Sequence, residues 1–172
     1  MFQVHDKIMY GTQGACEITE IADKNFGREK HRYYVCKSLS RRDETIFVPV
    51  DNEKLVAKMQ PLLSREEILR LIHDMPGEDP LWEEDETLRK QLHASILSRG
   101  DRRELVRLIR SLYLHKKERE SKGKKFHQCD ERCLKEAEEL INSEFSLVLQ
   151  IPPQQVVSFI RQQLEGPSPE TA

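Results

Sequence analysis

The sequence predicts an α+β protein in which a small antiparallel β-barrel is followed by an all-α domain of about five helices. Two observations support this. The spacing of apolar residues changes near residue 60, from a period of two to the 3.6-residue period of helices. In addition, the 172 residues are 37% hydrophobic and 34% charged, a composition that suits small, soluble, folded modules. We expect a barrel over residues 1–60, a helical domain over 61–165 and a disordered tail over 166–172.

The barrel is predicted from short strands separated by turns. Apolar positions alternate with polar ones in the first 57 residues, as in strands that bury one face. These positions include Val4, Ile8, Tyr10, Ile18, Ile21, Tyr33, Val35, Ile46, Val48 and Val50. Turn-forming residues gather at 11–14, 23–27 and 38–43. Four or five strands this short cover their apolar faces by curling into an SH3-like or Tudor-like barrel, with residues 45–50 as an exposed edge.

The helical domain begins after Pro61. Ser64 and Glu67 form a capping box for a first helix that ends before Pro76. The remaining helices are expected from Leu81 or Trp82 to Gly100, from Asp101 to Ser121, from Asp130, and from Pro153 to Leu164. Apolar residues expected to face the core of the last three helices include Leu105, Leu108, Leu112, Tyr113, Leu134, Phe145, Val156, Val157, Ile160 and Leu164.

Several classes of protein are disfavoured. No apolar run approaches the roughly 20 residues of a membrane helix, and the first residues lack the pattern of a signal peptide, so we expect a cytoplasmic protein with no membrane contact. The four cysteines, Cys16, Cys36, Cys129 and Cys133, are expected to be reduced. His127 lies near two of them, but the spacing H-x-C-x3-C is not a zinc pattern. With no activated nucleophile and no phosphate-binding glycine loop, we expect no metal, no cofactor and no enzymatic activity.

Charge is unevenly distributed along the chain, although the net charge is only −2. Residues 99–125 contain eleven Lys or Arg and four Asp or Glu, whereas residues 78–86 contain six acidic residues and no basic one. The basic stretch is either a surface for phosphate groups or an ordinary solvated helix face.

The string VHDKIMYGTQGACEITEI, followed by FVPVDN, resembles the RNA polymerase interaction domain of the CarD/CdnL transcription regulators, a domain shared with transcription-repair coupling factor. The strings PLWEEDETLRKQL, LSRGDRRELVRLIRSLY and AEELINSEFSLVL are similar to successive landmarks of the CarD C-terminal domain. The resemblance covers roughly residues 1–164. It implies that the barrel binds the β subunit of RNA polymerase and that the helical half holds promoter DNA open without reading its sequence.

The resemblance also suggests the residues of the polymerase contact. These are Lys24, Arg28, Arg41, Thr45, Ile46, Phe47 and Val48. Three positions depart from the family pattern: Gly is expected at His5, often His at Gln13, and often Arg at Phe47. The polymerase contact is therefore either more apolar in this chain or uses neighbouring bases.

For DNA, the resemblance implies a tryptophan wedge in the minor groove at the upstream edge of the transcription bubble, which corresponds to Trp82. The expected DNA-binding residues are Trp82, Arg89, Lys90, Arg102, Arg103, Lys116, Lys117, Lys124 and Lys125. Acidic residues follow Trp82 where the family often has basic ones. The alternative is that Trp82 is a core residue.

A second interpretation is an adaptor without a DNA role, in which a Tudor-like module binds a peptide or a modified lysine and the helical half is a platform for protein interactions. A lysine-reading cage needs several aromatic side chains at one rim. Tyr33 and Tyr34 are adjacent and so point to opposite faces of a strand, which argues against such a cage. We expect a monomer under either interpretation.

Overall fold

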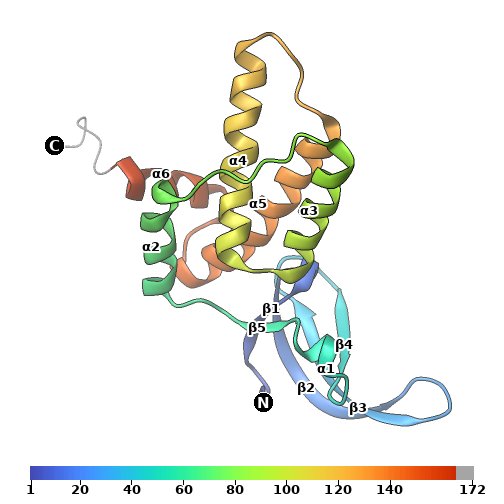
Figure 1. Ribbon diagram of the computed structural model, residues 1–172. Coiled ribbons are helices and arrows are strands. Elements are labelled where there is room, and N and C mark those ends of the chain that lie inside the picture. Colours follow the sequence, from blue (N-terminus) through green and yellow to red (C-terminus); the bar gives the residue numbers. More distant parts are fainter. Residues whose placement is uncertain (166–172) are drawn as a thin grey trace. The chain divides into compact units, whose positions relative to one another are not determined.

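The computed structural model describes residues 1–165 and divides into two compact units, one from Met1 to Leu62 and the other from Leu63 onward (Figure 1). The predicted disordered tail lies outside the described residues. Within residues 1–165 no helix is both long enough and apolar enough to cross a membrane.

The first unit is an antiparallel sheet of five strands in the order β4-β3-β2-β1-β5. Its elements are β1 (Lys7–Tyr10), a 3-10 turn (Gly11–Gln13), β2 (Ala15–Asn25), β3 (Lys30–Ser38), β4 (Thr45–Pro49), α1 (Glu53–Val56) and β5 (Met59–Pro61). Val48 of β4 and Met59 of β5 come from opposite edges of the sheet but belong to one buried cluster with Ile8, Ile18 and Tyr34. The sheet therefore curls around a single core, as a small barrel does.

The strands differ from the prediction in three places. β1 starts only at Lys7, and Val4 is 41% exposed. β2 continues to Asn25, so the predicted turn at residues 23–27 is shifted toward the C-terminus and Lys24 belongs to a strand. The short helix α1, capped by the side chain of Asn52, was not predicted because its four residues carry too little periodicity.

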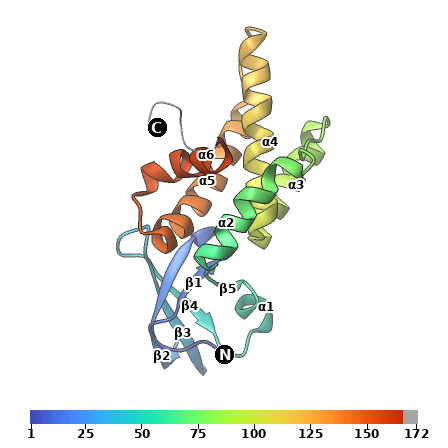
Figure 2. The ribbon, with the colours of Figure 1, turned by 90° about the vertical axis from the view of Figure 1, so that its left-hand side faces the viewer.

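The described residues of the second unit, 63–165, form five α-helices, in agreement with the predicted number of about five. They are α2 (Arg65–Asp74), α3 (Glu86–Arg99), α4 (Arg102–Ser121), α5 (Gln128–Leu149) and α6 (Val156–Glu165), with 3-10 turns η2 (Met75–Gly77) and η3 (Pro153–Gln155). In both ribbon views α4 and α5 run side by side, and the last turns of α4 stand clear of the other helices (Figures 1 and 2).

Capping residues account for most helix ends. The Ser64–Glu67 capping box is present at α2, and Asp101 accepts a hydrogen bond from the amide of Glu104 at α4. Gly100 ends α3 with φ of 67°, a left-handed conformation that glycine adopts without steric cost.

Two predicted helix starts were wrong. α3 begins at Glu86, after the cap residue Asp85, and not at Leu81 or Trp82. α5 begins at Gln128, so Asp130 lies inside its first turn and is buried. The sequence prediction started this helix at Asp130, because the partner that holds Asp130 in the interior, Arg89, is distant in sequence.

Candidate functional site

Strand β4 lies at one edge of the first unit's sheet, as predicted. It pairs with β3, and no other described strand pairs with its outer side. Val48 points into the core and is fully buried, whereas Phe47 points outward and is 40% exposed. Ile46 is half-buried and Thr45 is exposed. The edge therefore offers free backbone groups next to an exposed aromatic ring.

Three aromatic side chains form a cluster beside this edge. The ring of Phe26, in the β2–β3 turn, packs edge to face on Phe47 at 4.9 Å and on Tyr33 at 5.3 Å between centroids. Tyr33 and Phe47 are 6.3 Å apart. Phe26 is 57% exposed, a large value for a phenylalanine. Phe26 lies in a turn and so belongs to no periodic pattern that sequence reasoning could use. We name Phe26, Tyr33 and Phe47 the aromatic cluster.

The predicted basic residues of this unit do not form one patch. Lys24 pairs across from His31, which places it on the same face of the sheet as Tyr33, and it forms an ion pair with Glu20 at 3.4 Å. Arg28 lies in the turn before β3 and is exposed. Arg41 lies in the turn after β3, with Glu44 at 3.7 Å. Lys24 and Arg28 are therefore near the aromatic cluster, and Arg41 is at the opposite end of β3.

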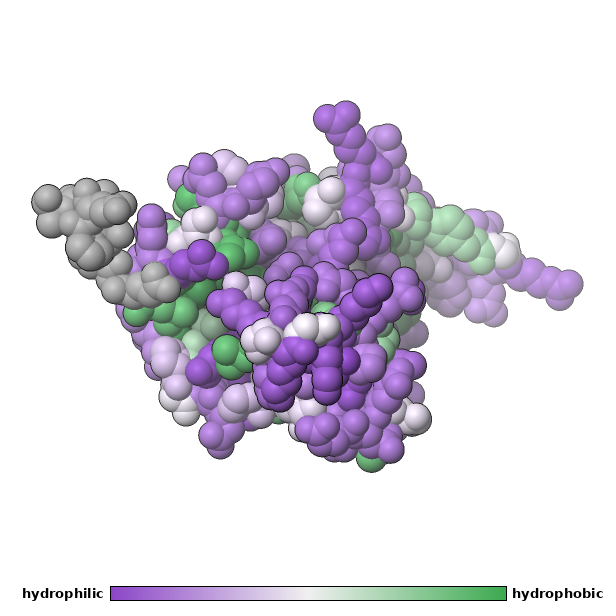
Figure 3. Space-filling model, turned by 90° about the horizontal axis from the view of Figure 1, so that it is seen from above, coloured by the Kyte–Doolittle hydropathy of each residue, from purple (hydrophilic) through white to green (hydrophobic). Residues whose placement is uncertain are grey.

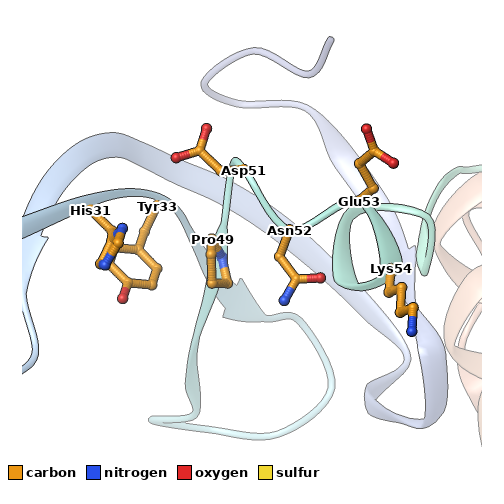
Figure 4. A pocket seen from close by; sticks show the side chains of 7 residues that line it. All are labelled: His31, Tyr33, Pro49, Asp51, Asn52, Glu53 and Lys54. Atoms are coloured by element: carbon orange, nitrogen blue, oxygen red, sulfur yellow. The ribbon is translucent and has the colours of Figure 1, made fainter.

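An open depression of about 640 Å³ lies next to Tyr33. Its lining comprises His31, Tyr33, Pro49, Asp51, Asn52, Glu53 and Lys54 (Figure 4). The carboxylates of Asp51 and Glu53 do not point toward the rings of His31 and Tyr33 in this view. The rings of the aromatic cluster touch one another, so they leave no gap for an ammonium group between them. Neither arrangement is a lysine-reading cage, although the cluster does gather three aromatic residues at one rim.

In the second unit, Trp82 lies in the extended segment between η2 and α3 and is half-buried. Its ring stacks on His115 of α4, with centroids 3.6 Å apart and planes tilted by 22°. The guanidinium carbon of Arg89 lies 4.6 Å from the ring centroid, in a cation–π contact. Trp82 is therefore held between groups from α3 and α4 and does not project from a helix start.

Arg89 holds the segment that carries Trp82. Its Nε and Nη2 donate to the two carboxylate oxygens of Asp130 at 3.0 and 3.1 Å, and the two side chains are 4% and 1% exposed. Its Nη1 donates to the carbonyl oxygens of Glu83 and Glu84, directly after Trp82. The structure thus places Arg89, expected at the DNA surface, in the interior, where it orders the Trp82 segment.

Two histidines adjoin this ion pair. Burial lowers the pKa of His115 below its ordinary 6.5, so the ring stacked on Trp82 is neutral at pH 7. Burial likewise lowers the pKa of His93, whose Nδ1 is 3.9 Å from Asp130. The indole Nε1 of Trp82 is buried without a hydrogen-bond partner, so any part of the indole that reaches solvent is carbon.

Arg102, also expected to contact DNA, forms a largely buried pair with Glu144. Its Nη2 donates to Glu144 Oε2 at 2.8 Å, and Glu144 is fully buried. Glu144 also accepts a hydrogen bond from the amide of Leu63. Arg102 thus ties the start of α4 to α5.

The arginines in the first half of α4 are engaged with the segment around η2. Arg103 and Arg107 both form ion pairs with Glu78. Arg110 donates to the carbonyl oxygens of Met75 and Glu78. These contacts neutralise part of the positive charge that the sequence places on α4.

The lysines that were expected to contact DNA differ in whether they have acidic partners. Lys116 pairs with Glu131 at 3.0 Å, and Lys90 of α3 pairs with Glu86 at 3.0 Å. Lys117 lies over the ring of Tyr113, and Lys124 and Lys125 are exposed in the loop after α4. Within residues 1–165 these last three lysines have no carboxylate within ion-pair distance. They form the basic tip, the name used below for Lys117, Lys124 and Lys125.

The cysteines are free thiols, and no group of three or more His, Cys, Asp or Glu in the described part of the chain could hold a metal ion. Burial raises the pKa of Cys36 and of Cys133 to about 12. Thiols with such pKa values are poor nucleophiles at neutral pH.

Comparisons with known proteins bear on both units. Residues 2–63 match the model of the CarD-like/TRCF RID domain. Over 163 residues the chain is 27% identical to YdeB of Bacillus subtilis (strain 168), named as a candidate transcription factor, and the match covers 92% of this chain and 99% of YdeB. The matched family is an interaction domain and not a known enzyme family, and it implies interaction with RNA polymerase. The resemblance predicted from the sequence is confirmed: residues 2–63 are a CarD-like/TRCF RID domain, and the two comparisons together support a CarD-like family and a role in transcription.

Proposed function

We propose that this protein binds the β subunit of RNA polymerase through the β4 edge and stabilises the open promoter complex through Trp82 and the basic tip. The observation that carries the proposal is that the sheet of the RID domain has an edge strand, β4, whose outer side is unpaired and lies beside the aromatic cluster. An edge strand can add to a sheet of another protein, because its free N–H and C=O groups form ladder hydrogen bonds while alternate side chains give specificity.

The aromatic cluster makes this polymerase contact mainly apolar. A strand added to β4 places one of its side chains opposite Phe47, and aromatic rings interact favourably with apolar cross-strand neighbours. Lys24 and Arg28 contribute charge only at the end of the strand near Phe26. We therefore expect the affinity for the β subunit to depend little on salt.

At the promoter, Trp82 acts on DNA that is already distorted. A fully buried tryptophan covers about 150–250 Å², which at about 25 cal/mol/Å² gives at most about 4–6 kcal/mol. Much of the Trp82 ring is already stacked on His115 and Arg89, so a new contact yields only part of this. Distorting an intact base step costs a few kcal/mol. Trp82 therefore favours melted over closed DNA, and that difference shifts the equilibrium toward the open complex.

The test is a promoter-opening assay with purified polymerase, in which the lifetime of the open complex is measured with and without the full chain. We expect the protein to lengthen the lifetime, and Trp82→Ala to shorten it while polymerase binding and the circular dichroism spectrum stay unchanged. Phe47→Asp should instead abolish polymerase binding, because it places a charge against the apolar contact. An unchanged lifetime at saturating protein would refute the proposal and favour an adaptor, which is indifferent to promoter DNA.

A further inference from the structure

A groove of about 760 Å³ lies on the second unit and is lined by α4, α5, α6 and η2. Seen from above, the molecule is mostly hydrophilic, but hydrophobic side chains gather beside the C-terminal end of the described chain (Figure 3). None of the residues of the Trp82 stack lines this groove.

The two walls carry apolar residues at helical spacing. On α4 these are Val106, Ile109 and Tyr113, and on α6 they are Val157, Ile160 and Leu164, both series at i, i+3 and i+7. The sequence predicted that Tyr113, Val157 and Leu164 face the core, but they are 39%, 48% and 40% exposed. Among residues 156–164 of α6, only Val156 is fully buried. The apolar face of α6 is thus wider than its packing within the chain requires, and a helix lying along the groove would cover the remainder.

The charges around the groove define what kind of helix fits. Arg110, Lys117 and Arg161 line it, against one acidic residue, Glu138. Burial raises the pKa of Glu138. The rim is therefore positive around an apolar interior, and it complements acidic residues that flank an apolar stripe.

We propose that this groove binds an amphipathic helix of a partner protein, with large apolar side chains at i, i+3 or i+4, and i+7 and with Asp or Glu on either side of that stripe. This inference goes beyond the proposed function, and it shares with it only Lys117. The chain's own residues 166–172, GPSPETA, contain no large apolar side chain and so lack the means to fill the groove.

The experiment uses the full chain, without DNA or polymerase, to select from a displayed library of single-helix peptides with unbiased charge. We expect the selected peptides to share the apolar stripe and to be acidic. Val157→Glu should weaken their binding at least about tenfold, since it places an acid on the apolar wall against an acidic ligand. Arg161→Glu should weaken it as well, and Lys90→Glu, the same charge change on α3 away from the groove, should leave it unchanged. Circular dichroism confirms that the variants are folded.

Three results overturn the inference. The first is selection of no peptide, or of peptides whose binding the groove variants do not change. The second is a dimer in sedimentation experiments that Val157→Glu dissociates, because the occupant is then a second copy. The third is a large gain in peptide affinity on truncation after Glu165, because the terminal segment is then the occupant. None of these outcomes depends on promoter opening, so the failure of this inference and that of the proposed function are distinguishable.

Discussion

Arg89 and Asp130 form a two-point ion pair inside the second unit, linking the first turn of α5 to α3 across 41 residues of sequence. Burying two charged side chains is costly unless they pair closely with each other and their remaining polar groups form hydrogen bonds. Here the backbone oxygens of Glu83 and Glu84 accept hydrogen bonds from Nη1 of Arg89. The pair thereby couples the fold of the helical unit to the position of Trp82.

Removing the acid from this pair should be costly. Asp130→Ala leaves Arg89 buried without a counter-charge, and we expect a loss of about 3–5 kcal/mol in the free energy of unfolding. The control is Glu131→Ala, which breaks the exposed pair with Lys116 and should cost at most about 1 kcal/mol. Urea denaturation measures both. Similar losses of unfolding free energy in the two variants would show that the buried pair contributes no more to stability than the exposed one.

His5 has φ of 74°, a left-handed backbone conformation that L-residues adopt at a cost of about 1–2 kcal/mol. His5→Gly should therefore raise the free energy of unfolding by about 1 kcal/mol, after the larger entropy of glycine in the unfolded chain is allowed for. His5→Ala is the matched control and should bring no gain, since alanine has the same Cβ and loses the contact with Glu17. Equal thermal midpoints for the Gly and Ala variants would contradict this account.

Stability should fall in mild acid because of His93. Burial lowers the pKa of His93 in the folded state below 6.5. The positive charge of Arg89 lowers this pKa further, whereas the negative charge of Asp130 raises it. The unfolded chain therefore binds more protons than the folded one just below pH 6.5, and stability decreases as pH falls through that range. His115 adds to the same trend. Denaturation midpoints between pH 7.5 and 5 measure the slope, and His93→Gln should reduce it. An unchanged slope in that variant would assign the effect to other groups.

The basic tip should account for much of the salt dependence of DNA binding. Each phosphate contact that is lost reduces the slope of log affinity against log salt by about 0.9. We therefore expect the combined change of Lys117, Lys124 and Lys125 to Ala to flatten the slope markedly. Lys135→Ala, on the exposed side of α5, is the control. Fluorescence anisotropy over a range of salt concentrations is the measurement, and parallel lines for the wild-type and triple variant would exclude the basic tip from the contact.

The order and type of most elements could be predicted from the sequence because local signals specify them. The Ser64–Glu67 box, the Asp101 cap and Gly100 all act within one helical turn, and each is where it was expected. The edge position of β4 followed from alternation together with strand count. The start of α3 did not, because the apolar Leu81 and Trp82 suggest a helix whereas Arg89 holds this segment extended from the side.

The candidate site was less predictable, because its geometry depends on long-range pairing. Without knowledge of its acidic partner, a basic residue is predicted to lie at the surface. Arg89 and Arg102 were therefore expected to contact DNA, although the structure pairs both of them with buried acidic residues. His115 and Phe26 were missed for a related reason. Neither belongs to a periodic pattern, and only the fold brings His115 onto Trp82 and Phe26 onto Phe47.

Because of how its arginines are paired, α4 carries its unpaired positive charge unevenly along its length. Arg103 and Arg107 pair with Glu78 and Arg110 donates to nearby carbonyl oxygens, whereas the basic tip has no carboxylate within ion-pair distance in the described residues. The cations without an acidic partner therefore gather at the far end of the helix and in the loop that follows it. A polyanion that approaches α4 is therefore attracted mainly to the C-terminal end of the helix. The ion pairs within the chain thus determine the orientation in which the two molecules meet.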